Sequence, residues 1–183
     1  MSDRALIRQC SPTMAGIKTG NLYMCDLTSV PELEEDVRRF NKANKDKGIK
    51  AALIGVRNGR AMIYVYRPRL LKRDLQDPLA RDILCSNGYC CDSICKCIDC
   101  LKERMEKSAS FPHEIGLMLG YPPEDVKGFI DNEGKNYKLC GMWKVYGDEK
   151  KASILWARYE KCTTVYSRCY DNGTNIKRLT VAV

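Results

Sequence analysis

The chain has 183 residues, of which 44% are hydrophobic and 30% are charged, a balance that suits a folded core and argues against an intrinsically disordered chain. Its net charge is +8, but 23 acidic residues are mixed among 31 basic ones, so no block of like charge resembles a nucleic-acid-binding tail. The longest apolar run, near residues 51–56, is too short to span a bilayer, and the N-terminus lacks a secretory signal pattern. We therefore predict a cytoplasmic protein with no membrane partner, and the charge pattern disfavours nucleic acid.

The N-terminal region predicts a short helix over residues 4–10, broken by Ser11-Pro12, and then a glycine-containing loop and a strand over 21–27. Ser29 and Glu32 have the spacing of a capping box, which starts a second helix that ends near Gly48.

Asn58-Gly59 separates two apolar segments, residues 49–57 and 60–67. This dipeptide is typical of two-residue hairpin turns, because both positions need positive φ. The second segment is apolar on both faces, which predicts a central strand covered on both sides.

The C-terminal half predicts mostly helices, with a break at Asp77-Pro78 in the first and a cap at Asp148 on the last. The helices are expected at residues 70–84, 93–107, 112–119, 123–131 and 149–173, and strands at 139–146 and 176–183. Strands and helices alternate without regular βαβ units, so we predict an α+β fold. The expected architecture is a single domain over 1–183, with a small, mostly antiparallel or mixed sheet, a central hairpin and several packed helices.

Eleven cysteines make the chain cysteine-rich, and six of them fall between Cys85 and Cys100. In a reducing compartment they are expected to be thiols or metal ligands instead of a disulfide framework. Thiolates at this density can hold zinc or an iron–sulfur cluster. The candidate metal ligands are Cys85, Cys90, Cys97 and Cys100. The alternative is a set of small apolar side chains packed beneath a helix.

The sole histidine, His113, lies in the segment Phe111-Pro112-His113-Glu114-Ile115-Gly116. An imidazole can transfer protons near neutral pH or ligate a metal or haem, and Glu114 can act as a base or bind a cation. The structural alternative is that both residues satisfy backbone groups in a tight corner. The corner formed with residues 123–131 also has helix-turn-helix spacing, although Glu124 and Asp125 would repel DNA phosphates.

Two further segments contain candidate site residues. On a strand over 139–146, Cys140, Met142, Lys144 and Tyr146 would share one face and could border a pocket. Lys18, between two glycines, could meet a phosphate, although the sequence has no strong phosphate-binding loop.

The chain resembles a bacterial family of unknown function numbered 3793, which is common in anaerobic Firmicutes. The resemblance rests on Cys10–Lys18, on Phe111–Gly116 with the Leu-Gly-Tyr-Pro and Glu-Asp-Val-Lys-Gly-Phe motifs that follow, on Trp143–Tyr146 and on Tyr159–Cys162. It implies no activity, but it places five candidates within matching motifs: Cys10, His113, Glu114, Cys140 and Cys162. The cysteines from 85 to 100 lie outside the family pattern.

These features favour a small cytoplasmic protein that binds a metal, a haem or a redox cofactor, with His113 and Glu114 at the site and Cys140 or Cys10 nearby. One alternative is an interaction or regulatory module with a helix-turn-helix-like corner. Another is a small enzyme in which His113 is the acid or base, with Glu114 and Lys144 as further catalytic candidates. Cys10, Lys18, Cys140 and Cys162 are the candidate cofactor-binding residues. The sequence identifies no protein or small-molecule partner.

Overall fold

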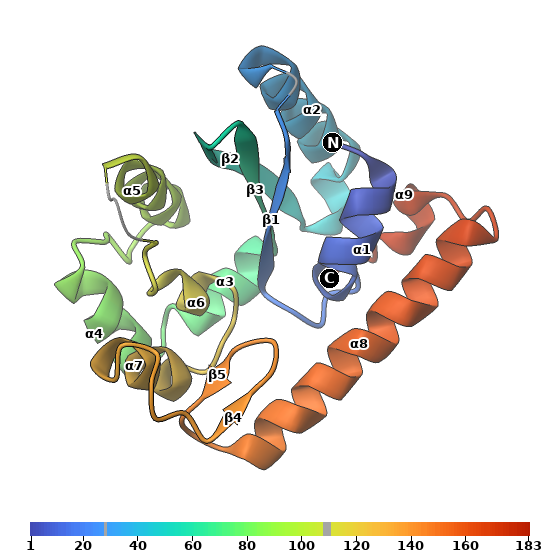
Figure 1. Ribbon diagram of the computed structural model, residues 1–183. Coiled ribbons are helices and arrows are strands. Elements are labelled where there is room, and N and C mark those ends of the chain that lie inside the picture. Colours follow the sequence, from blue (N-terminus) through green and yellow to red (C-terminus); the bar gives the residue numbers. More distant parts are fainter. Residues whose placement is uncertain (28, 108–110) are drawn as a thin grey trace. The chain divides into compact units, whose positions relative to one another are not determined.

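The computed structural model describes residues 1–27, 29–107 and 111–183, and these contain nine α-helices and two small antiparallel sheets (Figure 1). The predicted α+β class is confirmed. The chain divides into two compact units, which we call the first unit (residues 1–70 and 159–183) and the second unit (residues 71–158). The predicted single domain over 1–183 stays a prediction. Within the described segments, none of the helices has the length and apolar character needed to cross a membrane.

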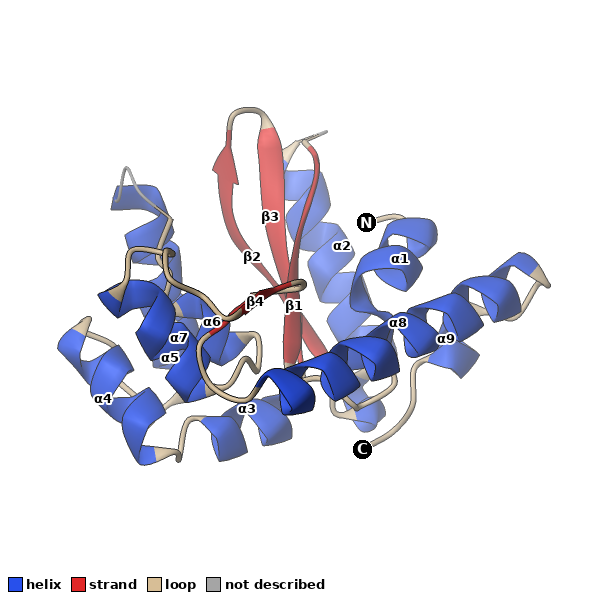
Figure 2. Cartoon of the chain, turned by 60° about the horizontal axis from the view of Figure 1, so that its bottom comes forward, coloured by secondary structure: helices blue, strands red, loops and turns tan. Residues whose placement is uncertain are grey.

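The first unit is built on a three-stranded antiparallel sheet with the strand order β1-β3-β2 (Figure 2). Its elements are α1 (Asp3–Met14), β1 (Gly20–Asp26), α2 (Val30–Ala43), η1 (Lys45–Lys47), β2 (Lys50–Arg57), β3 (Arg60–Tyr66) and α9 (Ile176–Leu179). The predicted hairpin is confirmed, because Asn58 and Gly59 have φ values of 50° and 71° and Arg57 pairs with Arg60. Strand β3 is the central strand and is buried from Ala61 to Tyr66, as its two-sided apolar pattern predicts.

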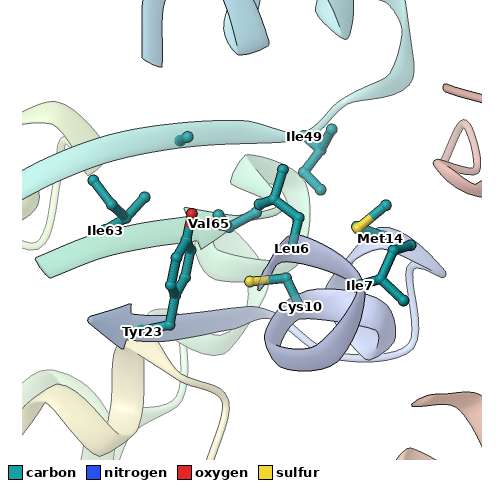
Figure 3. Close-up of a cluster of buried hydrophobic side chains, with 9 residues drawn as sticks. Leu6, Ile7, Cys10, Met14, Tyr23, Ile49, Ile63 and Val65 are labelled. Carbon is teal, nitrogen blue, oxygen red and sulfur yellow. The ribbon is translucent and has the colours of Figure 1, made fainter. Parts of the chain in front are cut away.

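The core of the first unit lies between α1 and one face of this sheet (Figure 3). Leu6 and Cys10 of α1 point toward Val65 of β3 and Tyr23 of β1. Burial of each large apolar side chain contributes about 1.5 to 3 kcal/mol.

Arg67, which follows β3, joins three separate segments of the first unit. Its side chain is 1% exposed, and its guanidinium donates to the carbonyl oxygens of Thr13 and Val181, both at 2.8 Å, and to those of Met14 and Lys47. These bonds tie the end of α1 and the η1 turn to the C-terminal segment. Burial lowers the pKa of Arg67 from its ordinary value of 12.5.

Two predictions for the first unit are wrong. The first helix does not stop at Ser11-Pro12 but continues to Met14, because the proline removes only one N–H donor and the Ser11 hydroxyl donates to the carbonyl of Ile7. The last segment is not a strand. It forms the short helix α9, capped by the Asn175 side chain, and the chain then docks through a bond from Val181 N to the carbonyl of Met14.

The second unit is mainly helical. It contains α4 (Pro78–Ser86), α5 (Ile94–Lys107), α6 (Ile115–Met118), α7 (Pro123–Asp131), β4 (Leu139–Cys140) and β5 (Lys144–Val145), while α3 (Pro68–Asp74) and α8 (Glu149–Asp171) extend across its boundaries. The predicted break at Asp77-Pro78 is confirmed, because the Asp77 carboxylate accepts from Ala80 N at 3.0 Å and caps α4. Asp148 likewise caps α8 by accepting from Lys151 N at 2.9 Å.

The predicted strand over residues 139–146 is wrong, because the chain reverses within it. Two strands of two residues, β4 and β5, pair as a hairpin with Cys140 opposite Lys144. Gly141 lies at this reversal and packs closely on Trp156, because it has no side chain: a Cβ there would lie 2.4 Å from the ring of Trp156. Helix α6 is also shorter than predicted, beginning at Ile115 instead of Pro112.

Candidate functional site: an aromatic pocket in the second unit

A pocket of 390 Å³ lies among α6, α7 and the β4–β5 hairpin, which are neighbours within the second unit (Figure 1). It is lined by the segment around the sole histidine, by the two short helices and by the hairpin: Phe111, His113, Ile115, Gly116, Leu119, Tyr121, Asp125, Val126, Phe129, Cys140, Gly141, Met142, Trp143 and Lys144. Most of its surface is apolar. Two segments that the sequence analysis treated separately therefore form one site.

The corner between α6 and α7 is close-packed because Gly116 has no side chain. A Cβ at this position would lie 2.8 Å from Val126 Cγ2 and 3.1 Å from the ring of Tyr121. Pro123 occupies the first turn of α7, where its missing N–H costs no helical hydrogen bond. Gly116 and Pro123 thus shape the corner between α6 and α7, and this corner lines the pocket.

The Asp125 carboxylate connects α7 to the hairpin. It is 2% exposed, and it accepts from Trp143 Nε1 at 2.7 Å, from Tyr146 N at 2.8 Å and from Gly147 N at 2.7 Å. Three donors stabilise a buried carboxylate that would otherwise carry a large desolvation penalty. Asp125 therefore positions the indole of Trp143 on the pocket wall.

Aromatic rings form the wall on this side. Tyr121 stacks on Trp143 at a centroid distance of 4.8 Å and an interplanar angle of 24°, and Trp156 meets Trp143 edge-on at 5.2 Å. Stacked and edge-to-face pairs are favoured geometries and hold the rings in fixed orientations. The pocket thus presents a rigid aromatic surface.

The polar edge of the pocket is formed by His113 and Lys144, which both lie near the Phe129 ring. The His113 ring lies 4.7 Å from the Phe129 ring at an angle of 55°. Lys144 Nζ lies 5.7 Å from the Phe129 centroid and 4.8 Å from the Tyr137 centroid, and it donates to the carbonyl of Gly134 at 2.6 Å. Cation–π contacts and one hydrogen bond fix the ammonium group beside the apolar lining.

The sequence predicted that four side chains of residues 140–146 share one face of a strand, but in the hairpin only three of the four line the pocket. Cys140, Met142 and Lys144 all line the pocket, and the Cys140 and Met142 side chains are exposed at its rim. Tyr146 is not among the lining residues. Its hydroxyl donates instead to the carbonyl of Lys135 at 2.8 Å.

Glu114 is placed in a buried ion pair and does not line the pocket. Its carboxylate is 4% exposed and accepts from Arg104 Nε at 2.6 Å and from the Tyr89 hydroxyl at 3.2 Å. Arg104 also donates to the backbone carbonyl and the side chain of Asn87. The partners of the Glu114 carboxylate are thus two side chains and not the backbone groups of the structural alternative, while His113, its neighbour in sequence, lines the pocket.

Cys10, Lys18 and Cys162 belong to the first unit. Burial raises the pKa of Cys10 to about 12 and lowers that of Lys18 to about 7, and the two groups partly oppose each other's shift. Lys18 Nζ donates to the carbonyl of Gly20. Lys18 is 6% exposed, and its role as a cofactor-binding or phosphate-binding residue stays a prediction. Cys162 is half-buried on α8.

Of the candidate metal ligands, Cys85 lies on α4, Cys90 lies in the connection that follows, and Cys97 and Cys100 lie on α5. Cys85, Cys90 and Cys100 are at least partly exposed, and Cys97 is buried. Among residues 1–27, 29–107 and 111–183, no group of three or more histidine, cysteine or acidic side chains is arranged to hold a metal ion. Zinc or an iron–sulfur cluster at these cysteines stays a prediction.

Sequence reasoning missed the central role of Asp125 and the aromatic lining from Tyr121 and Trp143. From the sequence, Asp125 was considered only as one of two acids that would repel DNA phosphates. The sequence did contain a signal for this role. Asp125 is an acidic residue two positions after Pro123, the first-turn proline, and it lies within three residues of the apolar face of the helix. Its donors come from residues 143–147, and only tertiary packing brings that segment to it.

Residues 6–180 match the model of a family described as "Protein of unknown function (DUF3793)". This match covers nearly the whole chain, so the chain belongs to that family, as the resemblance predicted. Neither a curated protein nor a solved structure matches it.

Proposed function

We propose that this member of the DUF3793 family binds a compact, planar aromatic molecule with an acidic group, such as an organic redox cofactor or a related metabolite, in the cytoplasm. The observation that carries the proposal is the 390 Å³ pocket, whose apolar aromatic lining has His113 and Lys144 at one edge. Ligand pockets of this size are typically apolar, with a few polar groups that orient the ligand.

The shape of the pocket supports a flat ligand. The stacked Tyr121–Trp143 pair and Phe129 offer ring faces and edges, and aromatic ligands pair favourably with both. The Lys144 ammonium is already fixed by the Gly134 carbonyl, so binding an anion there costs little additional side-chain entropy. The positive charge beside an apolar wall favours an acidic substituent.

The position of His113 favours a second candidate function, acid–base catalysis on the bound molecule. Its imidazole lines the pocket, whereas Glu114 is occupied by Arg104 and Tyr89. A histidine at the edge of an apolar pocket can donate a proton to a ligand or accept one from it. Binding is the first property to test, because either role requires it.

Anilinonaphthalene sulfonate, a planar aromatic anion, is a suitable probe of this pocket. The two tryptophans of the chain are Trp143 and Trp156, so quenching of their emission by energy transfer reports binding in the second unit. Lys144→Met is expected to weaken probe binding about tenfold, because loss of one charge-assisted contact costs about 1.5 kcal/mol. His113→Gln is expected to weaken it to a smaller extent.

Lys127→Met is the matched control, because Lys127 is exposed on α7 and pairs with Asp131 away from the pocket. It is expected to leave the affinity unchanged. If Lys144→Met alters the tryptophan spectrum in the absence of probe, the affinity of His113→Gln decides between the outcomes. The His113 side chain is exposed and contacts the Phe129 ring. Equal affinity of the wild type and both pocket variants would contradict the proposal.

A further inference from the structure

Two cysteine sulfurs of the second unit lie close together where α4 ends and the connection to α5 begins. Cys85 lies in the last turn of α4, and Cys91 lies in the connection. Their Sγ atoms are 3.7 Å apart, with the Cys85 thiol donating to Cys91. Neither residue lines the aromatic pocket, so this pair is independent of the proposed ligand site.

The backbone around the pair is held by contacts from α5. Arg104 Nη1 donates to the carbonyl of Asn87 at 3.0 Å, and its Nη2 donates to the Asn87 side chain at 3.1 Å. The thiol of Cys97 donates to the carbonyl of Cys90 at 2.9 Å. These bonds keep the connection folded against α5, so Cys91 is held beside Cys85 instead of sampling many positions.

The two thiols differ in accessibility. Cys85 is exposed, whereas Cys91 is half-buried. Burial, together with the neighbouring Cys85, raises the pKa of Cys91 to about 11, and the nearby Arg81 guanidinium opposes this shift. Cys91 therefore stays protonated at neutral pH. Cys85 is the thiol that a reagent in solution reaches first.

We propose that Cys85 and Cys91 form a reversible disulfide when the protein meets a hydroperoxide. The thiolate of Cys85 attacks the hydroperoxide, the O–O bond breaks and an alcohol (or water) leaves, so that Cys85 becomes a sulfenic acid. The sulfur of Cys91 then attacks the sulfenic sulfur, and its proton leaves with the hydroxyl as water. The two thiols together lose two electrons, and the hydroperoxide gains them.

The separation of the two sulfurs is short compared with most pairs of cysteines in a fold. The Sγ atoms are 3.7 Å apart, and a disulfide bond is about 2.05 Å long, so the sulfurs must approach by about 1.7 Å. A disulfide formed in this way is a reversible modification and differs from a permanent framework, which a reducing compartment does not support. A thiol reductant is expected to restore both cysteines.

Peptide mapping of the oxidised protein tests the assignment. The reduced chain is treated with one equivalent of hydrogen peroxide, its remaining thiols are alkylated, and it is digested with trypsin and chymotrypsin without reduction. Cleavage after Arg81, Tyr89 and Lys96 separates residues 82–89 from residues 90–96. The expected product is these two peptides joined, lighter by two hydrogen atoms than their sum, and separated again by dithiothreitol.

Residues 90–96 contain three cysteines, so variants identify the partner. The linkage is expected to disappear in Cys91→Ser and to persist in Cys90→Ser and in Cys95→Ser, the matched exposed control. Fragmentation of the wild-type linked peptide assigns the sulfur directly, even if Cys91→Ser does not fold. The proposal is overturned if the link joins Cys90 or Cys95, or if Cys85 accumulates as sulfinic acid with no linked peptide.

Discussion

Replacement of Asp125 with alanine is expected to lower the free energy of unfolding of the second unit by about 3 to 5 kcal/mol. The carboxylate is 2% exposed and accepts three hydrogen bonds. Its removal leaves the buried indole N–H of Trp143 and the partly buried backbone N–H groups of Tyr146 and Gly147 without this acceptor. Each such donor carries a desolvation cost of about 1 to 3 kcal/mol.

Urea denaturation followed by tryptophan emission measures this effect, because both tryptophans lie in the second unit. Asp125→Asn should lower the free energy of unfolding by less than Asp125→Ala, because the amide oxygen can still accept from the two backbone N–H groups. Some loss is still expected, because the NH₂ group of the asparagine then faces the N–H group of Trp143 Nε1, and neither can accept. Asp131→Ala is the control, because Asp131 forms an exposed pair with Lys127, and such pairs contribute about 0 to 1 kcal/mol. A loss below about 1 kcal/mol for Asp125→Ala would show that Asp125 does not hold the hairpin.

The unfolding free energy of the wild type is expected to rise by about 2 kcal/mol between pH 7 and pH 9 through Lys18 alone. Burial lowers the pKa of Lys18 from 10.5 to about 7 in the folded state. Between these values the unfolded chain binds more protons than the folded chain, so stability increases with pH. Below pH 7 both states are protonated and this increase is absent.

At higher pH, Cys10 has the opposite effect to Lys18 and lowers the free energy of unfolding as the pH rises. Burial raises its pKa from 9.0 to about 12, so between these values the unfolded chain has lost a proton that the folded chain retains. Stability through Cys10 therefore falls as the pH rises. The contributions of Cys10 and Lys18 nearly cancel from pH 9 to 10.5, so these two groups together add no further stability above pH 9.

Urea denaturation at a series of pH values, followed by circular dichroism, compares the wild type with Lys18→Met. The variant should lose the rise between pH 7 and pH 9, whereas Lys42→Met, which changes an exposed lysine on α2, should retain it. The difference between the variants isolates Lys18 from all other titrating groups. An identical pH dependence in Lys18→Met and the wild type would contradict a buried, neutral Lys18.

The two proposals concern separate parts of the second unit and can fail separately. Probe binding tests the pocket around Trp143 and Lys144. Peroxide mapping tests the Cys85–Cys91 pair, and neither cysteine is among the pocket-lining residues. Probe binding without disulfide formation would support only the proposed ligand site. Disulfide formation without probe binding would support only the proposed cysteine pair.

Local chemistry determined much of the secondary structure of this protein. Asn58-Gly59 specifies its hairpin because the turn needs positive φ at both positions, and Ser29, Asp77 and Asp148 start their helices by accepting from nearby backbone N–H groups. These interactions join residues within a few positions of one another. Sequence patterns therefore predict them directly.

The site, in contrast, was decided by contacts between distant residues. The sequence singled out His113, Cys140 and Lys144 but did not show that they share a pocket, and it paired His113 with Glu114, whose carboxylate binds Arg104 instead. The hairpin at residues 139–145 was predicted as one strand, because nothing local shows that a side chain at Gly141 would meet Trp156. Side-chain packing over such separations sets where the chain reverses and which groups face the pocket, and only the tertiary structure contains that information.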